Sequence, residues 1–208
     1  MAEYIDDLTE IILGPRESVL LMPGSGVSVE VKTQLLEKYS QTYREHVTKP
    51  IIIGFNFRSF EDLTLEFFAA WLAAPRDDNG FVRKLLDFGD YHECVAAWRF
   101  GGIMQVREFQ DYILRVVLHY YCNKQGEIRF DPVEVASLLE EIPRQNTLHR
   151  LLVNVLCHYL ERLMNDEMRK AVLEKLKKTT LYDISSRMLQ ISSQNGGLMA
   201  IPNIEIFN

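Results

Sequence analysis

Residues 63–74, "LTLEFFAAWLAA", place a tryptophan among aromatic and small apolar side chains and contain no basic group. From residue 60 onward the apolar residues recur in steps of three and four, at Phe60, Leu63, Phe67, Trp71 and Ala74. This spacing predicts a helix over 59–74 with one buried face. Ser59 and Asp62 have the spacing of a capping box at its start. Phe67 and Trp71 are predicted to pack in the core.

Two short apolar runs precede this helix and flank the sequence "PGSG" at 23–26. Pro, Gly and Ser favour tight turns, so residues 18–31 predict a β-hairpin or a tight connection between strands. Apolar residues at helical spacing predict one helix over 32–47. "KPIIIGF" at 49–55 predicts a short strand that is covered on both faces.

From residue 91 onward the sequence is mostly helical in pattern. Five segments carry apolar residues at helical spacing: 91–102, 106–122, 133–142, 146–163 and 166–176. Trp98 and Phe109 are predicted to join the core. Beyond Lys178 the chain becomes rich in serine, which predicts a flexible tail. Together these elements predict an α+β fold with a small N-terminal sheet and a helical second half.

The composition indicates a soluble intracellular protein, nuclear or cytoplasmic. The chain has 208 residues, 47% of them hydrophobic, and a net charge of −6 with scattered basic residues. Nucleic acid binding requires a concentrated basic face, so a direct nucleic acid partner is not expected. No apolar run approaches the roughly 18 residues that cross a bilayer, and the acidic N-terminus does not resemble a secretory signal. The three widely spaced cysteines fit a reducing compartment.

Patterns that would indicate catalysis or metal binding are weak. The "GSG" at 24–26 lacks the spacing of a nucleophile elbow or of a phosphate-binding loop. Adjacent helical side chains point about 100° apart, so residues 92–94 cannot converge unaided on one ion. A zinc site could combine His119 and Cys122, one helical turn apart, with Cys157 and His158. A metal protein or enzyme could otherwise be built on His92, Cys94, His119 and Cys122. We expect a non-enzymatic protein without a cofactor, and the alternative is a cryptic zinc-binding protein or an enzyme that uses these residues.

Three segments, in order, resemble the BTB/POZ family. Residues 31–45 resemble a family segment in which a strand end, a Leu pair and a Ser-x-x-Phe sequence follow one another, although Lys32 stands where histidine is usual. Residues 63–74 resemble the family's Trp-Leu-Tyr helix, with Ala73 in place of the tyrosine and without the glycine that follows. The matching positions in these two segments and in 91–117 are Val31, Leu35, Leu36, Ser40, Tyr43, Phe67, Trp71, Leu72, Ala97, Phe100, Ile103, Val106 and Phe109.

The resemblance covers roughly residues 17–122 and is closest to divergent BTB-like domains common in fungal proteins. It implies a small sheet covered by α-helical hairpins, with extra C-terminal helices. The expected divisions are an N-terminal amphipathic helix at 1–15, the BTB-like domain at 16–125, a helical extension at 126–180 and a flexible tail at 181–208. The family implies homodimerisation, docking to a cullin scaffold as a ubiquitin-ligase adaptor, or recruitment of chromatin and transcription partners.

Two sets of residues are candidates for these contacts. The apolar stripe of the N-terminal segment and two residues of the 32–47 helix are expected at a homodimer interface: Ile5, Leu8, Ile11, Ile12, Leu35 and Tyr39. The alternative is that the N-terminal helix folds back on its own domain. The aromatic residues of "GFNFRSF" at 54–60 are expected to dock a partner: Phe55, Phe57 and Phe60.

Overall fold

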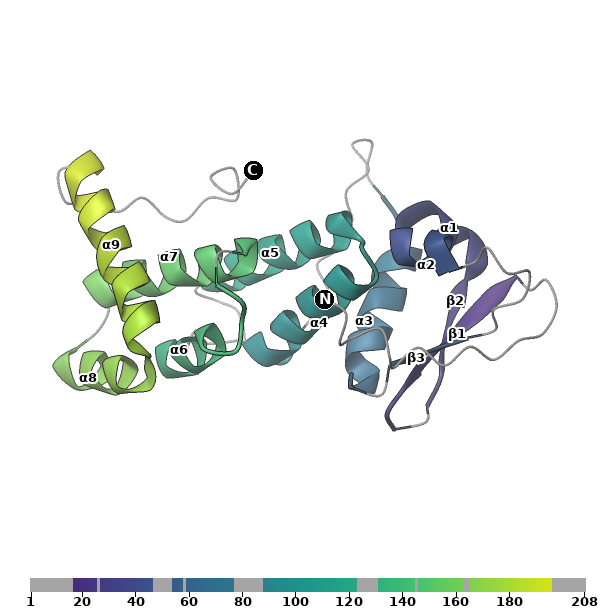
Figure 1. Ribbon diagram of the computed structural model, residues 1–208, viewed down its shortest axis with the longest axis horizontal. Helices are drawn as coiled ribbons and strands as arrows, with labels where there is room; N and C mark the ends of the chain where they lie inside the picture. The colour runs from purple at the N-terminus through teal and green to yellow at the C-terminus, as the bar shows by residue number, and fades with distance from the viewer. Residues whose placement is uncertain are drawn as a thin grey trace. The chain divides into compact units, whose positions relative to one another are not determined.

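The computed structural model describes residues 17–25, 27–46, 54–57, 59–76, 88–122, 131–144, 146–162 and 165–195. This part of the chain is mainly helical, with a small sheet near the N-terminus (Figure 1), so the predicted α+β class is confirmed. The chain divides into two compact units. Unit 1 is Met1–Phe88 with Ala96–Ile113, and unit 2 is Gly89–Val95 with Leu114–Asn208. The division therefore falls within two helices and not at residue 125, where the sequence placed it.

The sheet of unit 1 has three strands in the order β2-β1-β3. Strands β1 (Ser18–Pro23) and β2 (Val29–Lys32) form the predicted antiparallel hairpin, with Leu21 opposite Val29. Strand β3 (Gly54–Phe57) pairs in parallel with the other edge of β1. Side chains alternate across a strand, so every second residue of β1 is buried, including Val19 and Leu21.

The predicted helix over 32–47 is two helices, α1 (Thr33–Tyr39) and α2 (Gln41–His46). Ser40 breaks the helix by adopting an extended conformation, with φ −95° and ψ 116°. Its buried hydroxyl donates to the Met104 carbonyl oxygen at 2.7 Å and accepts from the Tyr43 amide at 3.0 Å. Ser40 therefore caps α2 and ties it to a segment 64 residues further along the chain.

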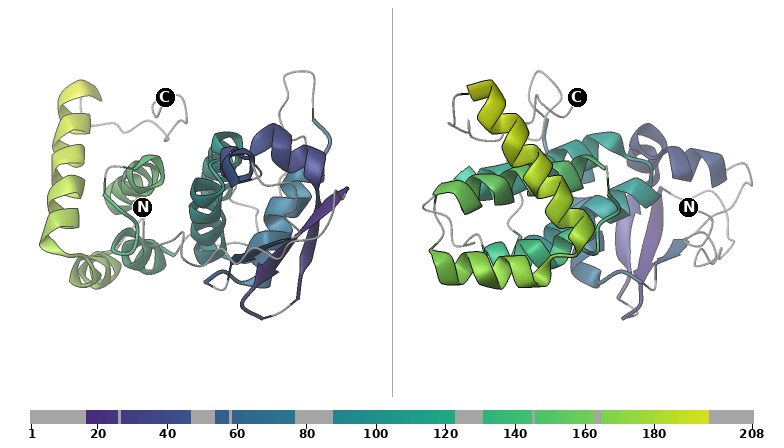
Figure 2. Two further views of the ribbon diagram at one scale, coloured as in Figure 1. Left: turned by 45° about the vertical axis from the view of Figure 1, so that its right-hand side comes forward. Right: turned by 60° about the vertical axis from the view of Figure 1, so that its left-hand side comes forward.

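Helix α3 (Asp62–Ala73) contains the segment that suggested the fold, and it contacts β1 and β2. Figure 2 (left) shows it against one face of the sheet. The helix buries Phe67, Phe68 and Trp71, so the core positions predicted for Phe67 and Trp71 are confirmed. Phe109 is also fully buried, and its ring centroid lies 5.2 Å from that of Trp71.

Helices α4 (Tyr91–Ile103) and α5 (Arg107–Cys122) both have residues in each unit. The turn between them contains Gln105 at φ 50°, a left-handed conformation that L-residues rarely adopt. The prediction that Trp98 lies in the core is wrong. Trp98 is only partly buried, because it lies at the flank of α4, whereas Ala97 and Phe100 occupy its buried face.

Unit 2 is built from α6 (Pro132–Leu139), α7 (Thr147–Arg162), α8 (Asp166–Lys175) and α9 (Lys178–Asn195), together with the unit 2 parts of α4 and α5. Helix α6 contacts α7 and α8, and α7 contacts α9. Almost every described side chain of α7 from Leu148 to Leu160 is buried, so this helix forms the centre of the unit.

The prediction of a flexible tail from residue 181 is wrong up to residue 195, because α9 occupies this stretch. Ile184 is buried in unit 2, and Asp183 pairs with Arg144 at 2.6 Å. Serine has only a moderate preference against helices, so one buried stripe and these contacts outweigh the Ser-rich composition. Among the described helices, none combines the length and apolarity needed to cross a membrane.

Candidate docking site

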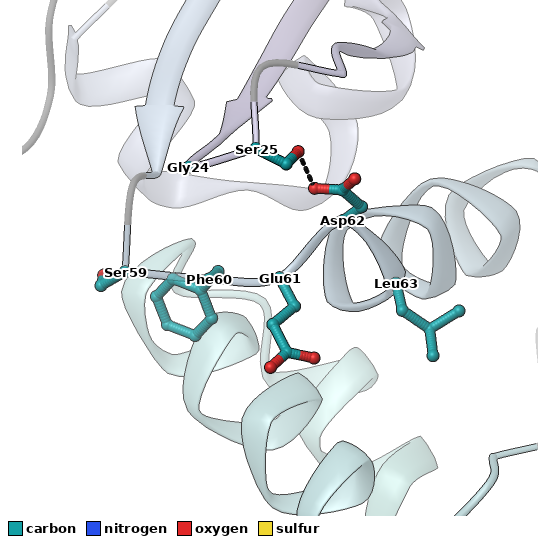
Figure 3. Close-up of a pocket in the computed structure, with 7 residues that line it drawn as sticks. All are labelled: Gly24, Ser25, Ser59, Phe60, Glu61, Asp62 and Leu63. Carbon is teal, nitrogen blue, oxygen red and sulfur yellow. Dashed lines mark hydrogen bonds between the residues drawn. The ribbon is translucent and has the colours of Figure 1, made fainter.

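An open hollow lies in unit 1 where the β1–β2 turn meets the start of α3 (Figure 3). Its volume is about 530 Å³, and seven residues line it: Gly24, Ser25, Ser59, Phe60, Glu61, Asp62 and Leu63. We call this hollow the turn pocket. It is formed by two segments that are far apart in the sequence and that the sheet brings together, because β1 lies beside β3.

Ser25 and Asp62 connect the two sides of the turn pocket, since the Ser25 hydroxyl donates a hydrogen bond to Asp62 Oδ1. This contact replaces the capping box predicted for Ser59 and Asp62, which is not formed. Glu61 occupies the N-cap position of α3, but its side chain makes no capping hydrogen bond. The Thr64 amide instead donates to the Glu61 carbonyl oxygen at 3.1 Å.

Apolar surface and negative charge lie side by side in the turn pocket. Figure 3 shows Phe60 and Glu61 next to each other, on the opposite side of the segment from Asp62. Leu63 is 37% exposed although it is a large apolar residue. The lining contains two carboxylates and no basic side chain. Such a surface suits a side chain with an apolar stem and a positively charged or hydrogen-bond-donating end.

The three aromatic residues predicted to dock a partner have different environments. Phe60 is half-buried and lines the turn pocket, with its ring centroid 5.2 Å from that of Phe100. The docking prediction for Phe57 is wrong, because its side chain is only 4% exposed and packs edge-to-face on Phe100 at 4.8 Å. Phe55 belongs to β3, but its side chain is not among those that the structure describes.

The candidates for a dimer interface are only partly described. Ile5, Leu8, Ile11 and Ile12 lie outside the described residues. Leu35 and Tyr39 are half-buried on α1. The Tyr39 ring packs edge-to-face on Trp71, with centroids 5.4 Å apart, so part of its surface is used within unit 1.

The histidines and cysteines do not assemble into a metal site in the part of the chain that is described. No group of three or more His, Cys, Asp or Glu residues there is placed to hold an ion. His92 is exposed and its Nε2 lies 3.8 Å from Glu134 Oε1. Burial raises the pKa of the Cys94 thiol well above its usual value, so it stays protonated and unreactive.

The structure also describes the side chains of three other suggested zinc ligands. Cys157 is buried, and its thiol donates to the Ile184 carbonyl oxygen at 3.7 Å. His158 is buried on the same helix, whereas His119 is exposed on α5. The side chain of Cys122 lies outside the described residues.

No sequence motif predicts a site at Ser25, Glu61 and Asp62. The sequence contained one signal, because "PGSG" predicts a tight turn that presents Ser25 at its tip. The pairing of this turn with the start of α3 depends on the parallel neighbours β1 and β3, which no local pattern specifies.

No protein-family model and no curated protein sequence matches the chain.

Proposed function

We propose that the chain is a non-enzymatic protein-interaction module of BTB-like architecture, and that it recruits a partner protein at the turn pocket. The observation that carries this proposal is the pocket itself. It places the half-buried Phe60 and the exposed Leu63 with the carboxylate of Glu61, in the segment after β3 where the family resemblance implies partner docking. Apolar anchors with a polar rim are typical of protein interfaces.

The order of elements also supports a BTB-like architecture. A β-hairpin is followed by two short helices, a third strand beside the hairpin, and then helices that pack on the sheet. The three segments that resemble the family fall on β2 with α1 and α2, on α3, and on α4 with α5. The recruited partner would be a cullin scaffold or a chromatin or transcription factor.

Binding to a purified cullin N-terminal domain tests the adaptor form of this proposal. We expect the wild-type chain to bind it and Leu63→Asp to weaken binding by about tenfold or more, because the change places a third carboxylate on an apolar anchor. Leu63 is the second residue of α3, where aspartate favours the helix, so the variant should remain folded. Isothermal titration calorimetry measures both affinities.

Leu173→Asp is the matched control, because Leu173 is a 46% exposed leucine of unit 2. It should bind the cullin domain as the wild type does. A wild-type chain that does not bind the cullin domain contradicts the adaptor role. Equal affinity of Leu63→Asp and the wild type contradicts docking at the turn pocket.

The second part of the proposal is homodimerisation through the apolar stripe of residues 4–12. An isologous interface uses the same stripe on both copies, so Leu8→Asp with Ile12→Asp places four charges in it. Light scattering after size exclusion should give twice the 24.2 kDa chain mass for the wild type and the single mass for the double variant. A mass that the two changes leave unaltered rules out this interface.

A further inference from the structure

A group of basic and aromatic residues lies in unit 1 at the end of α1 and just after α3. Arg76 covers the indole of Trp71, with its guanidinium carbon 4.3 Å from the ring centroid, and it lies 5.2 Å from the centroid of Tyr39. The ammonium of Lys38 lies 4.7 Å from the same Tyr39 ring. We call Lys38, Tyr39, Trp71 and Arg76 the cationic cluster.

Neither cation of this cluster has an anionic partner in the part of the chain that is described. No carboxylate forms an ion pair with Lys38 or Arg76 there, and the Nη2 atom of Arg76 is buried without a hydrogen-bond acceptor. The Nη2 atom is therefore closed to an external ligand, which can meet only the other nitrogens of the guanidinium. Arg44 adds a third positive charge nearby, because its guanidinium donates to the Glu37 and Lys38 carbonyl oxygens at the end of α1.

The geometry fixes which part of Arg76 can meet a ligand. Its guanidinium lies against Trp71 and beside Tyr39, so aromatic rings occupy its surroundings and hold the side chain in place. A stacked guanidinium still offers in-plane N–H groups, and with Nη2 buried these can donate a charge-assisted hydrogen bond to one carboxylate oxygen. Lys38 contributes a point charge beside the guanidinium.

We propose that the cationic cluster binds a carboxylate side chain from an acidic segment of a partner protein. Nucleic acid is a poorer ligand, because Trp71 is only 2% exposed and its ring is unavailable for stacking on a base. The site is separate from the turn pocket in its residues and charge, and it does not depend on the function proposed above.

The probe for this site is acetyl-tetraglutamate amide, with acetyl-tetraglutamine amide as the uncharged comparison. In a Trp98→Phe background Trp71 is the only tryptophan, so its emission reports binding. We expect the glutamate peptide to change this emission at low ionic strength and the glutamine peptide to leave it unchanged. Arg76→Gln should weaken binding by about tenfold, because a charge-assisted hydrogen bond is lost.

Two further variants make the test specific. Arg76→Lys keeps the charge but loses the planar guanidinium that stacks on Trp71, so it should bind with intermediate affinity. This variant replaces Arg76→Gln if thermal unfolding shows that Arg76→Gln does not fold. Lys32→Gln removes an exposed charge at the opposite end of α1 and should change binding by no more than about twofold.

Three results would overturn the proposal. If the two peptides bind equally or not at all, Arg76 serves only to cover Trp71. If folded Arg76→Gln and Arg76→Lys both bind as the parent does, the peptide binds elsewhere. If inorganic phosphate displaces the peptide at an equal or lower concentration than free tetraglutamate does, the site is a phosphate site.

Discussion

Phe100 is the residue around which the aromatic core of unit 1 is arranged. It is fully buried, and edge-to-face contacts join it to Phe57, Phe60 and Phe68 at centroid distances of 4.8, 5.2 and 5.0 Å. These partners come from β3, from the turn pocket and from α3. Phe100 therefore connects the sheet, the proposed docking site and the main helix of the unit.

We predict that Phe100→Ala lowers the free energy of unfolding of unit 1 by about 3–5 kcal/mol, because it leaves a large cavity and removes three ring contacts. Both tryptophans of the chain, Trp71 and Trp98, belong to unit 1, so urea unfolding followed by their emission measures this unit. Val27→Ala, at a 59% exposed site, should change it by less than about 0.5 kcal/mol. A loss below about 1 kcal/mol for Phe100→Ala would show that the core is packed differently.

His149 makes unit 2 sensitive to pH. Its side chain is 3% exposed, and its Nε2 atom is buried without a hydrogen-bond acceptor in the described part of the chain. Burial lowers the pKa of His149, while Asp183 and Glu140 oppose this effect and Arg144 adds to it. Because the folded state disfavours the imidazolium, the unfolded state binds more protons below its own pKa of about 6.5, and stability falls as the pH falls below that value.

We predict that amide hydrogen exchange in α7, corrected for the intrinsic rate, shows less protection at pH 5.5 than at pH 7.5. His149→Gln should reduce this difference, whereas His119→Gln, at an exposed histidine, should leave it unchanged. An equal pH dependence in His149→Gln and the wild type would assign the effect to another group.

Single residues were predictable where the reason lies within one helix. Phe67 and Trp71 follow from helical spacing, and both are buried. Phe57 was predicted to be a docking residue, and this was wrong because Phe100, from a distant helix, covers it. Nothing in the local sequence of Phe57 indicates this contact. For the same reason Asp62 appeared to be a capping residue, although its partner is Ser25 on the β1–β2 turn.

At the scale of elements, the junction of α1 and α2 depends on one hydroxyl group. We predict that Ser40→Ala destabilises unit 1 by about 1–3 kcal/mol, because the change removes the cap of α2 and leaves the Met104 carbonyl oxygen without this donor. Tryptophan emission during urea unfolding measures the loss. Ser28→Ala, at an exposed serine before β2, should have no measurable effect. A Ser40→Ala variant as stable as the wild type would mean that the two hydrogen bonds do not hold the junction.

The helices from α4 to α8 were predictable, because each carries apolar residues at a constant helical spacing. The break at Ser40 and the helix α9 were not. Ser40 leaves the helical conformation for a hydrogen bond to Met104, and α9 is held by contacts such as Arg144 with Asp183, 39 residues apart. Sequence periodicity contains no information about such distant partners.

At the scale of the whole molecule, the two units offer different chemistry. Unit 1 carries the turn pocket, which is acidic and partly apolar, and the cationic cluster, which is positively charged. Unit 2 is a set of helices around the buried α7. Two surfaces of opposite charge on one unit suit a module that contacts more than one segment of other proteins.

Site-specific photo-crosslinking in the native cell tests most directly whether the turn pocket docks another protein. With p-benzoylphenylalanine at position 63, we predict discrete crosslinked products that Glu61→Lys abolishes, because the exposed Glu61 supplies charge to the pocket. The same probe at position 173 should not give these products. Products at position 63 that persist unchanged in Glu61→Lys, or an absence of products at that position, would contradict docking at the turn pocket.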